Sequence, residues 1–143
     1  MKPSLRGLTA IVAAAVIASA AAASAQTTDD STAKVPFAFT VGTKTLPRDV
    51  YRISRLTGHM DVVQIRGLRG GAIVASQPEG PDRNDPSPRL VFHRYGDSYF
   101  LREIRMPGNT GLALPATRLE RDAAEKIASN AAPEVVVIPT PQQ

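Results

Sequence analysis

The residues of this 143-residue sequence that suit acid–base chemistry lie close together in one segment. His93 is a candidate general base, Asp97 or Glu103 can orient it, and Ser98 is the nearest nucleophile. Such a set is typical of a hydrolase. Ser98 falls in an expected turn and His93 lies several residues along an expected strand, so their side chains should be far apart. We therefore favour a protein that is not an enzyme.

The same segment also combines positive charge with aromatic rings. Arg94 and Tyr99 are expected to form a cation–π pair, which contributes about 0.5–1 kcal/mol at an exposed site. Faces of this composition also mark protein interfaces. A purely structural role in packing is the favoured interpretation of this face, and the functional alternative is a shallow site for an acidic sugar or for the carboxylates of a partner protein. The predicted ligand-binding residues are His93, Arg94, Tyr99 and Arg102.

The sequence predicts neither a metal site nor a cofactor. The two histidines, His59 and His93, lack a metal-ligand spacing, and the chain has no cysteine. Acidic and amide residues alternate in segment 82–85 as in a calcium loop, but the glycine and distal glutamate of an EF-hand are missing. The glycine-rich segment 67–71 opens no helix, so it predicts a turn and not a phosphate-binding loop.

The first 25 residues have the three parts of a secretory signal peptide. Lys2 and Arg6 supply positive charge, residues 8–23 are an apolar run, and Ala23-Ser24-Ala25 fits the motif that signal peptidase cleaves. The apolar run is shorter than the roughly 20 residues needed to span a bilayer. We expect cleavage before Gln26, export to the periplasm or the extracellular space, and no stable membrane insertion afterwards.

The expected mature chain carries little net charge. It keeps 15 of the 17 lysines and arginines against 13 acidic residues, and the two signs alternate along the sequence. Because no block of five or six like charges occurs, a nucleic-acid partner is not expected. About 118 residues suffice for one domain with its own core.

The mature sequence predicts a mainly β fold, with an antiparallel sheet of five to seven strands that forms a small sandwich or a partly open barrel. Apolar and polar residues alternate at 35–41, and turns with glycine separate further strand segments. We expect a single domain over residues 35–139, a flexible leader at 26–34 and a tail at 140–143. The predicted strands are 35–41, 50–56, 60–66, 72–75, 89–95 and 98–106, and residues 134–138 are either a last strand or a disordered tail.

The clearest local prediction is a hairpin around Gly96-Asp97, a two-residue turn signal. Its register sets His93 opposite Phe100 and Arg94 opposite Tyr99. We expect this hairpin at the centre of the sheet.

Two further segments stand apart from the strands. Residues 77–88 contain four prolines and predict an exposed, mobile loop that neither pairs nor packs. Residues 117–129 predict one C-terminal helix, because Thr117 and Glu120 fit a capping box and a narrow apolar stripe follows. We expect that stripe to lie on the sheet and, because it is narrow, to dock weakly. It consists of Leu119, Ala123 and Ile127.

Three stretches of the sequence stand out as motifs. They are Val35–Gly42 with Leu46-Pro47 and Tyr51–Ile53, Leu90–Asp97 with Tyr99–Leu101, and Leu114-Pro115 with Arg118, Glu120 and Arg121. Together they resemble a group of small, secreted, uncharacterised bacterial β-rich proteins. In that group Ala-Gly usually follows the first Leu-Pro, where this chain has Arg48-Asp49. The resemblance implies export and a β-rich domain with a C-terminal helix, and it implies no activity, ligand or site residue.

These observations favour an exported, non-enzymatic module that binds a partner protein or a glycan through a sheet face or edge, without a cofactor. Two alternatives stay open. One is a hydrolase that uses His93, and the other is a structural subunit in which residues 134–138 add a strand to a neighbour's sheet. The sequence leaves the ligand and the oligomeric state open.

Overall fold

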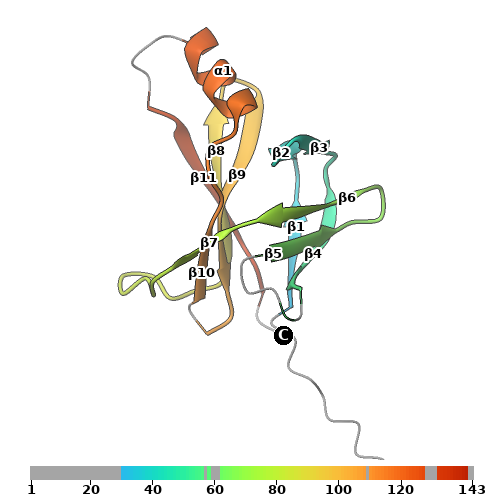
Figure 1. The fold of residues 1–143 in the computed structure, drawn as a ribbon, viewed down its shortest axis with the longest axis vertical. Helices are drawn as coiled ribbons and strands as arrows, with labels where there is room; N and C mark the ends of the chain where they lie inside the picture. Colours follow the sequence, from blue (N-terminus) through green and yellow to red (C-terminus); the bar gives the residue numbers. More distant parts are fainter. Residues whose placement is uncertain (1–29, 57, 59–61, 109, 128–131, 142–143) are drawn as a thin grey trace, which may run out of the picture.

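The computed structural model describes residues 30–56, 58, 62–108, 110–127 and 132–141. Within these ranges the chain forms two β-sheets and one α-helix, so the mainly β prediction is confirmed (Figure 1). The four-stranded sheet, which we call sheet A, consists of β1 (Ser31–Val35), β4 (Asp49–Arg55), β5 (Val62–Arg66) and β6 (Gly71–Ala75). These strands follow the order β1-β4-β5-β6.

The seven-stranded sheet, sheet B, contains the remaining strands. They are β2 (Phe39–Val41), β3 (Lys44–Leu46), β7 (Gln77–Glu79), β8 (Arg89–Tyr95), β9 (Ser98–Met106), β10 (Thr110–Ala113) and β11 (Glu134–Pro139). Its main order is β11-β8-β9-β10-β7, and hairpin β2–β3 joins it because β2 pairs in parallel with β9. The helix, α1 (Arg118–Ile127), lies beside the β8–β9 hairpin (Figure 1).

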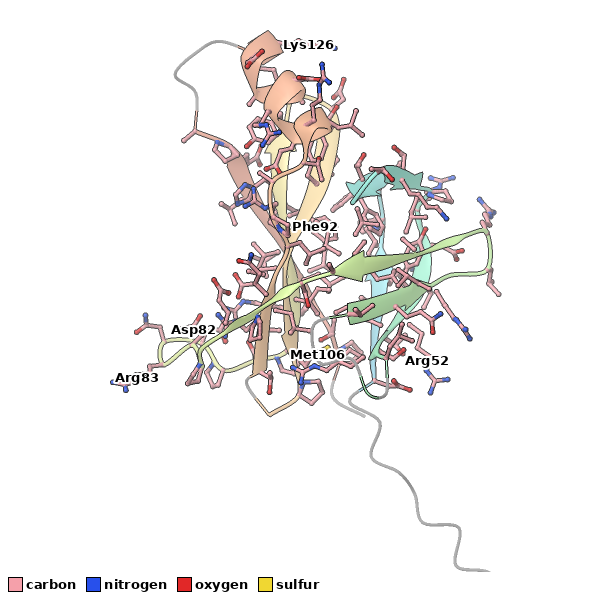
Figure 2. The ribbon with its side chains drawn as sticks, in the orientation of Figure 1. Arg52, Asp82, Arg83, Phe92, Met106 and Lys126 are labelled. Atoms are coloured by element: carbon pink, nitrogen blue, oxygen red, sulfur yellow. The ribbon has the colours of Figure 1, made fainter. Side chains whose placement is uncertain are left out.

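The two sheets share one hydrophobic core, as in a small sandwich. Phe39 of sheet B has its ring centroid 5.2 Å from that of Tyr51 in sheet A and 5.3 Å from that of Phe92 in sheet B, both edge to face. Figure 2 shows Phe92 between the two sheets. Because side chains alternate between the faces of a strand, the period-two pattern of the sequence puts one apolar face of each sheet into this core.

The N-terminal segment departs from the prediction in two ways. Residues 31–34, expected within a flexible leader, belong to β1, which pairs with β4. The expected single strand 35–41 is interrupted at residues 36–38, and the chain passes there from sheet A to sheet B. Pro36 lacks the N–H that a continuing ladder needs, so a break at this position is physically reasonable.

The prediction that residues 77–88 neither pair nor pack is wrong. Their first three residues form β7, which continues the line of β6 and pairs with β10. Pro78 is tolerated because β7 is the edge strand of sheet B. Farther along, Arg89 Nη2 donates a hydrogen bond to Asp82 Oδ2 at 2.6 Å, so an ion pair fastens the loop to β8. Arg83 lies on the outer side of this loop (Figure 2).

The central hairpin is confirmed. β8 and β9 pair with His93 opposite Phe100 and Arg94 opposite Tyr99, and Gly96 takes a φ of 60° in the turn. Non-glycine residues adopt that left-handed conformation much less readily. The last segment, left open by the sequence, is strand β11 and pairs with β8.

The predictions for the two ends of the chain have different outcomes. The expected signal peptide, residues 1–25, lies outside the described residues. Residue 140, expected in a tail, is buried, and the Thr140 N–H donates a hydrogen bond to the carbonyl oxygen of Pro88 at 3.0 Å. In the described part of the chain, no helix has the length and apolar character needed to cross a membrane.

Candidate functional site

The structure divides the four predicted ligand-binding residues into two pairs on opposite faces of sheet B. Arg94 and Tyr99 lie opposite each other and share the face that carries Phe37. His93 lies on the other face, together with Arg102, which is the extra residue of a bulge in β9. Since neighbouring residues of a strand point to opposite faces, the four side chains cannot line one shallow site.

The Arg94–Tyr99 pair is already engaged within the fold. The Arg94 guanidinium lies 5.3 Å from the centroid of the Tyr99 ring, as a cation–π pair. Phe37 stacks on the same ring at 3.8 Å with an interplanar angle of 13°. Arg94 Nε also donates a hydrogen bond to the carbonyl oxygen of Gly96 at 2.7 Å. These contacts account for the pair by packing around the hairpin turn.

The second pair meets a carboxylate that the sequence analysis assigned only to helix capping. The Glu120 side chain is 3% exposed, and its Oε1 accepts hydrogen bonds from Arg102 Nη1 at 2.9 Å and from the Tyr95 hydroxyl at 3.2 Å. His93 Nδ1 lies 3.3 Å from the same oxygen. The capping prediction holds in part, because Thr117 Oγ1 accepts the Glu120 N–H at 3.3 Å. The carboxylate itself turns towards the sheet.

The electrostatics of this cluster keep the Tyr95 hydroxyl protonated. Burial raises the pKa of Tyr95 above its usual value, and the neighbouring Glu120 carboxylate raises it further, because ionisation would place two negative charges together. Arg102 acts in the opposite direction. Arg102 Nε also donates to the carbonyl oxygen of Leu114 at 2.9 Å, which ties the bulge of β9 to the segment before α1.

The polar contacts of Glu120 attach the helix to the sheet, and the predicted apolar stripe faces the hairpin turn but buries little surface there, as its narrow width leads one to expect. Glu120 is the one buried residue of α1, whereas Leu119 and Ile127 are 48% and 43% exposed. The stripe borders an open hollow beside the hairpin turn. Helix residues 128–129 of the prediction lie outside the described residues.

The groups considered for a hydrolase are not assembled in this structure. Ser98 is exposed at the start of β9, and no hydrogen bond between Ser98 and His93 occurs among the described atoms. Glu103 pairs with Arg105, and Asp97 is exposed in the hairpin turn. No group of three or more His, Cys, Asp or Glu side chains within the described ranges is placed to hold a metal ion.

A cleft opens where the two sheets separate, with a volume of about 330 Å³. One wall is the hairpin β2–β3, and the opposite wall is β6, of which four consecutive residues, 72–75, border the cleft. Side chains of consecutive strand residues alternate between the faces, so four in a row border one cavity only if the backbone edge of the strand faces it. Phe100, Leu101 and Leu114 form a buried apolar floor.

The edge of β6 that faces the cleft carries backbone groups that pair with no strand in the described part of the chain. The β5–β6 hairpin closes with the Gly67 N–H bonded to the carbonyl oxygen of Gly70 at 2.8 Å. Bonded and non-bonded pairs alternate along an antiparallel ladder, so Gly71, Ile73 and Ala75 direct their N–H and C=O groups away from β5. β6 is an outer strand in sheet A as described, and no other described strand takes up these groups.

No family model, no curated protein and no solved structure matches this chain. Its function must therefore be inferred from its own geometry, in which the cleft offers backbone groups that pair with no other described strand.

The continuation of β6 shows which strand would occupy the cleft if the sheet were extended. Beyond residue 76 the same edge of the strand is paired with β10, as Gln77 and Glu79 lie opposite Ala113 and Gly111. β10 ends at Ala113, and the chain turns away at Pro115 towards α1. The free edge is thus the position that β10 would fill if it were longer.

Polar groups lie at the two ends of this cleft. Lys44 borders it on the hairpin side, and Thr117 and Glu120 border it at the start of α1. Sequence reasoning missed the cleft because its walls, β3, β6 and the segment after β10, are brought together only by the crossing of the chain between sheets. The signal in the sequence was the pair of a short apolar strand at 72–75 and Pro115 just after a glycine-containing segment.

Proposed function

We propose that the protein is an exported, non-enzymatic binding module that takes up an extended segment of a partner protein as an added strand along β6. The observation that carries this proposal is the unpaired backbone edge of β6 in the wall of the cleft. Addition of a strand to a free sheet edge is a recurring mode of peptide recognition, in which main-chain hydrogen bonds supply affinity.

The walls of the cleft suit a peptide better than a sugar. Its floor is apolar, so alternate side chains of an added strand face apolar residues, while the exposed Lys44 offers a positive charge at one end. Sugars bind by stacking on exposed aromatic rings and through many polar groups, whereas Phe100, the one ring at this cleft in the described chain, is 6% exposed. Of the two partners favoured by the sequence, we choose the protein.

Export is part of the proposal and rests on the sequence of the first 25 residues. The order of positive charge, apolar run and small-residue motif supports cleavage before Gln26. Mass spectrometry of the N-terminus, after expression of the whole gene in a bacterial host and separation of cell compartments, tests it. A product in the cytoplasm that retains residues 1–25 would contradict export and leave the strand-addition proposal untouched.

The strand-addition site is tested by selecting displayed random peptides against the purified protein and measuring their affinity for two variants. Ile73→Pro removes a backbone N–H that faces the cleft, and Ile73→Ala keeps it. The Ile73 side chain is 61% exposed, so neither change opens a cavity, and proline is tolerated on an edge strand when its N–H faced outwards. We expect the proline variant to lose about tenfold or more in affinity, since several main-chain bonds are disturbed.

Two results would contradict the site. One is equal affinity of the selected peptides for the proline and alanine variants, with both variants folded by circular dichroism. The other is that Thr43→Trp, which places a large side chain in the cleft, leaves the affinity of every selected peptide unchanged. Thr43 is exposed and borders the cleft, while Arg48→Trp, also exposed but outside it, is the matched control.

The structural-subunit alternative also has an observation behind it. β11 belongs to the chain's own sheet through β8, but Val135 and Val137 on it are 58% and 48% exposed. An apolar edge strand of this kind can pair with another copy. A concentration-independent monomer mass in solution would rule out this second function.

A further inference from the structure

Lysine and arginine side chains gather at one end of sheet A, on its outer face. Lys34 is opposite Val50 in the β1–β4 ladder, and Arg66 is opposite Arg52 in the β4–β5 ladder. Opposite residues of an antiparallel pair share a face, as do residues two apart in a strand, so Lys34, Val50 and Arg66 lie on one face. Figure 2 shows through Arg52 that this face points away from sheet B. Arg48 borders the same hollow as Lys34 and Val50.

The turn between β5 and β6 adds a further arginine at this end. The Arg69 N–H donates a hydrogen bond to Asp49 Oδ2 at 3.1 Å, which places the turn beside the first residue of β4. The turn projects beyond the neighbouring strands (Figure 1). We call these cations and the exposed apolar side chains among them the basic end. It consists of Lys34, Arg48, Arg66 and Arg69 with Val50 and Leu68.

The two apolar side chains of the basic end are exposed to water. Leu68, in the projecting turn, is 94% exposed, more than any other large apolar side chain in the described part of the chain, and Val50 is 47% exposed. Apolar surface in water is unfavourable in proportion to its area. A leucine at the tip of a turn therefore gains from a partner that is itself apolar.

The positive charge of the basic end is not compensated within the described chain. Its four cations are exposed, and none of them forms an ion pair with a described residue. The neighbouring Asp49 carboxylate accepts backbone N–H groups, from Val50 at 2.8 Å and from Arg69, so cations remain in excess. By contrast, Arg89 and Arg105, which lie opposite each other in sheet B, are each matched by a carboxylate.

An anionic lipid surface suits both features of the basic end at once. Lipid phosphates attract each nearby lysine or arginine, and the headgroup boundary accepts an apolar side chain. A free anion would compensate the charge but leave Leu68 in water, and a neutral bilayer would accept Leu68 but not compensate the charge. Because the four cations are spread over a strand face and a turn, they suit a surface with many phosphates better than one small ligand.

We propose that the basic end attaches the protein to a membrane surface that contains anionic phospholipid. Leu68 enters the headgroup boundary, and the four cations lie against lipid phosphates. The attachment is peripheral and reversible. It does not depend on the strand-addition cleft, so the protein would take up a peptide strand while held at a membrane.

Cosedimentation with vesicles tests the attachment, with residues 1–25 removed so that their apolar run does not contribute. Vesicles of equal parts phosphatidylcholine and phosphatidylglycerol should bind the protein about tenfold or more tightly than vesicles of phosphatidylcholine alone, because only the former attract the cations. Added salt should weaken binding to the anionic vesicles by screening that attraction. Equal binding to the two kinds of vesicle overturns the proposal.

Matched variants separate the basic end from general charge attraction. Arg69→Gln should weaken binding to the anionic vesicles about fivefold, which is the effect of one basic residue near an anionic leaflet. Arg83→Gln removes the same charge from an exposed position on the opposite side of the molecule (Figure 2) and should change binding less than about twofold. Equal weakening by the two variants overturns the site.

A fluorescent reporter distinguishes a membrane from an acidic protein partner. The sequence contains no tryptophan, so Leu68→Trp introduces a single one. Its emission should shift to shorter wavelength on the anionic vesicles, because the indole enters a less polar layer. Leu119→Trp, at a helix position that is 48% exposed, should keep its emission. An emission of the Leu68→Trp variant that vesicles leave unchanged, or binding to polyglutamate as tight as to the vesicles, overturns the proposal.

Discussion

At the scale of single residues, the carboxylate of Glu120 organises the region around α1. It gathers the side chains of Arg102, Tyr95 and His93 from two strands onto one helical position. A buried charge is tolerated in such a place because its oxygens are matched by donors. Removing the charge leaves those donors with a weaker, uncharged acceptor.

We predict that Glu120→Gln lowers the free energy of unfolding by about 1–3 kcal/mol, because the charge-assisted hydrogen bond from Arg102 is weakened and the partly buried Tyr95 hydroxyl is left with an uncharged acceptor. Urea unfolding followed by circular dichroism measures the change. Glu125→Gln, an exposed position on the same helix, is the control and should stay within about 0.5 kcal/mol of the unmodified protein. Equal effects of the two substitutions would contradict the role given to Glu120.

The tyrosines predict a loss of stability at alkaline pH. Burial raises the pKa of both Tyr51 and Tyr95, and the neighbouring Glu120 carboxylate raises the pKa of Tyr95 further. The folded state therefore keeps protons that the unfolded state has lost once the pH passes about 10. The stability that the two protonated tyrosine hydroxyls contribute to the fold is fully present below that pH. It is lost as the pH rises through their higher pKa values in the folded protein.

The measurement is the free energy of unfolding from pH 8 to pH 11 in the protein and in Tyr95→Phe. Phenylalanine has no proton to lose, so the variant should show a shallower decline above pH 10, whatever its stability at neutral pH. An unchanged slope would show that the Tyr95 hydroxyl ionises as freely in the fold as in the unfolded chain.

Several residue-level relationships were predictable from the sequence, and others were not. The position of His93 opposite Phe100 and of Arg94 opposite Tyr99 followed from the turn at Gly96, because a two-residue turn fixes the register. The meeting of Glu120 with His93 and Arg102 had no such local signal. It depends on where the helix lands on the sheet, and on a bulge that turns Arg102 to the helix side.

At the scale of elements, the exposure of the helix's apolar stripe agrees with the weak docking that the narrow width of the stripe predicts. The stripe is half exposed at Leu119, so little apolar surface is buried there. We predict that Leu119→Ala lowers the free energy of unfolding by less than about 1 kcal/mol, in proportion to that area. Leu112→Ala, at a side chain that is 1% exposed, should cost about 2–5 kcal/mol by leaving a cavity.

Urea titrations of the two variants make this comparison with the chemistry of the substitution held constant. A loss at Leu119 as large as that at Leu112 would mean that the stripe docks the helix after all. The contribution of Glu120 would then be secondary.

Apart from β1, the strands missed by the alternation of apolar and polar residues are the short ones. The five- to nine-residue strands β4, β5, β6, β8 and β9 each show an apolar pattern of their own. Strands β3, β7 and β10 have three or four residues, too few for a period to be read. β3 and β10 each pair with the strand next to them in sequence, whereas β7 pairs with a distant one and Pro78 is placed opposite Leu112. The β6 cleft depends on β3 and on the end of β10, so the cleft could not be predicted from the alternation of residues alone.

At the scale of the whole molecule, the two sheets form one cooperative unit because residues of both meet in one core. Phe39, 1% exposed, contacts Tyr51 in one sheet and Phe92 in the other. The strand formed by β6 and β7 also passes from one sheet to the other. A substitution at Phe39 should therefore lower the stability of both sheets equally.

We predict that Phe39→Ala lowers the free energy of unfolding by about 3–5 kcal/mol, the usual loss for a buried phenylalanine, and that both sheets lose it together. Hydrogen exchange read by mass spectrometry reports protection separately for peptides from β4–β5 and from β8–β9. In a cooperative two-state domain, the most protected amides of both segments exchange through global unfolding, so their protection should fall by the same factor. Protection that falls in β8–β9 while β4–β5 keeps its original value would show that the sheets unfold independently. The cleft between them would then be able to widen without unfolding the module, and strand addition along β6 would have to include the energy of that opening.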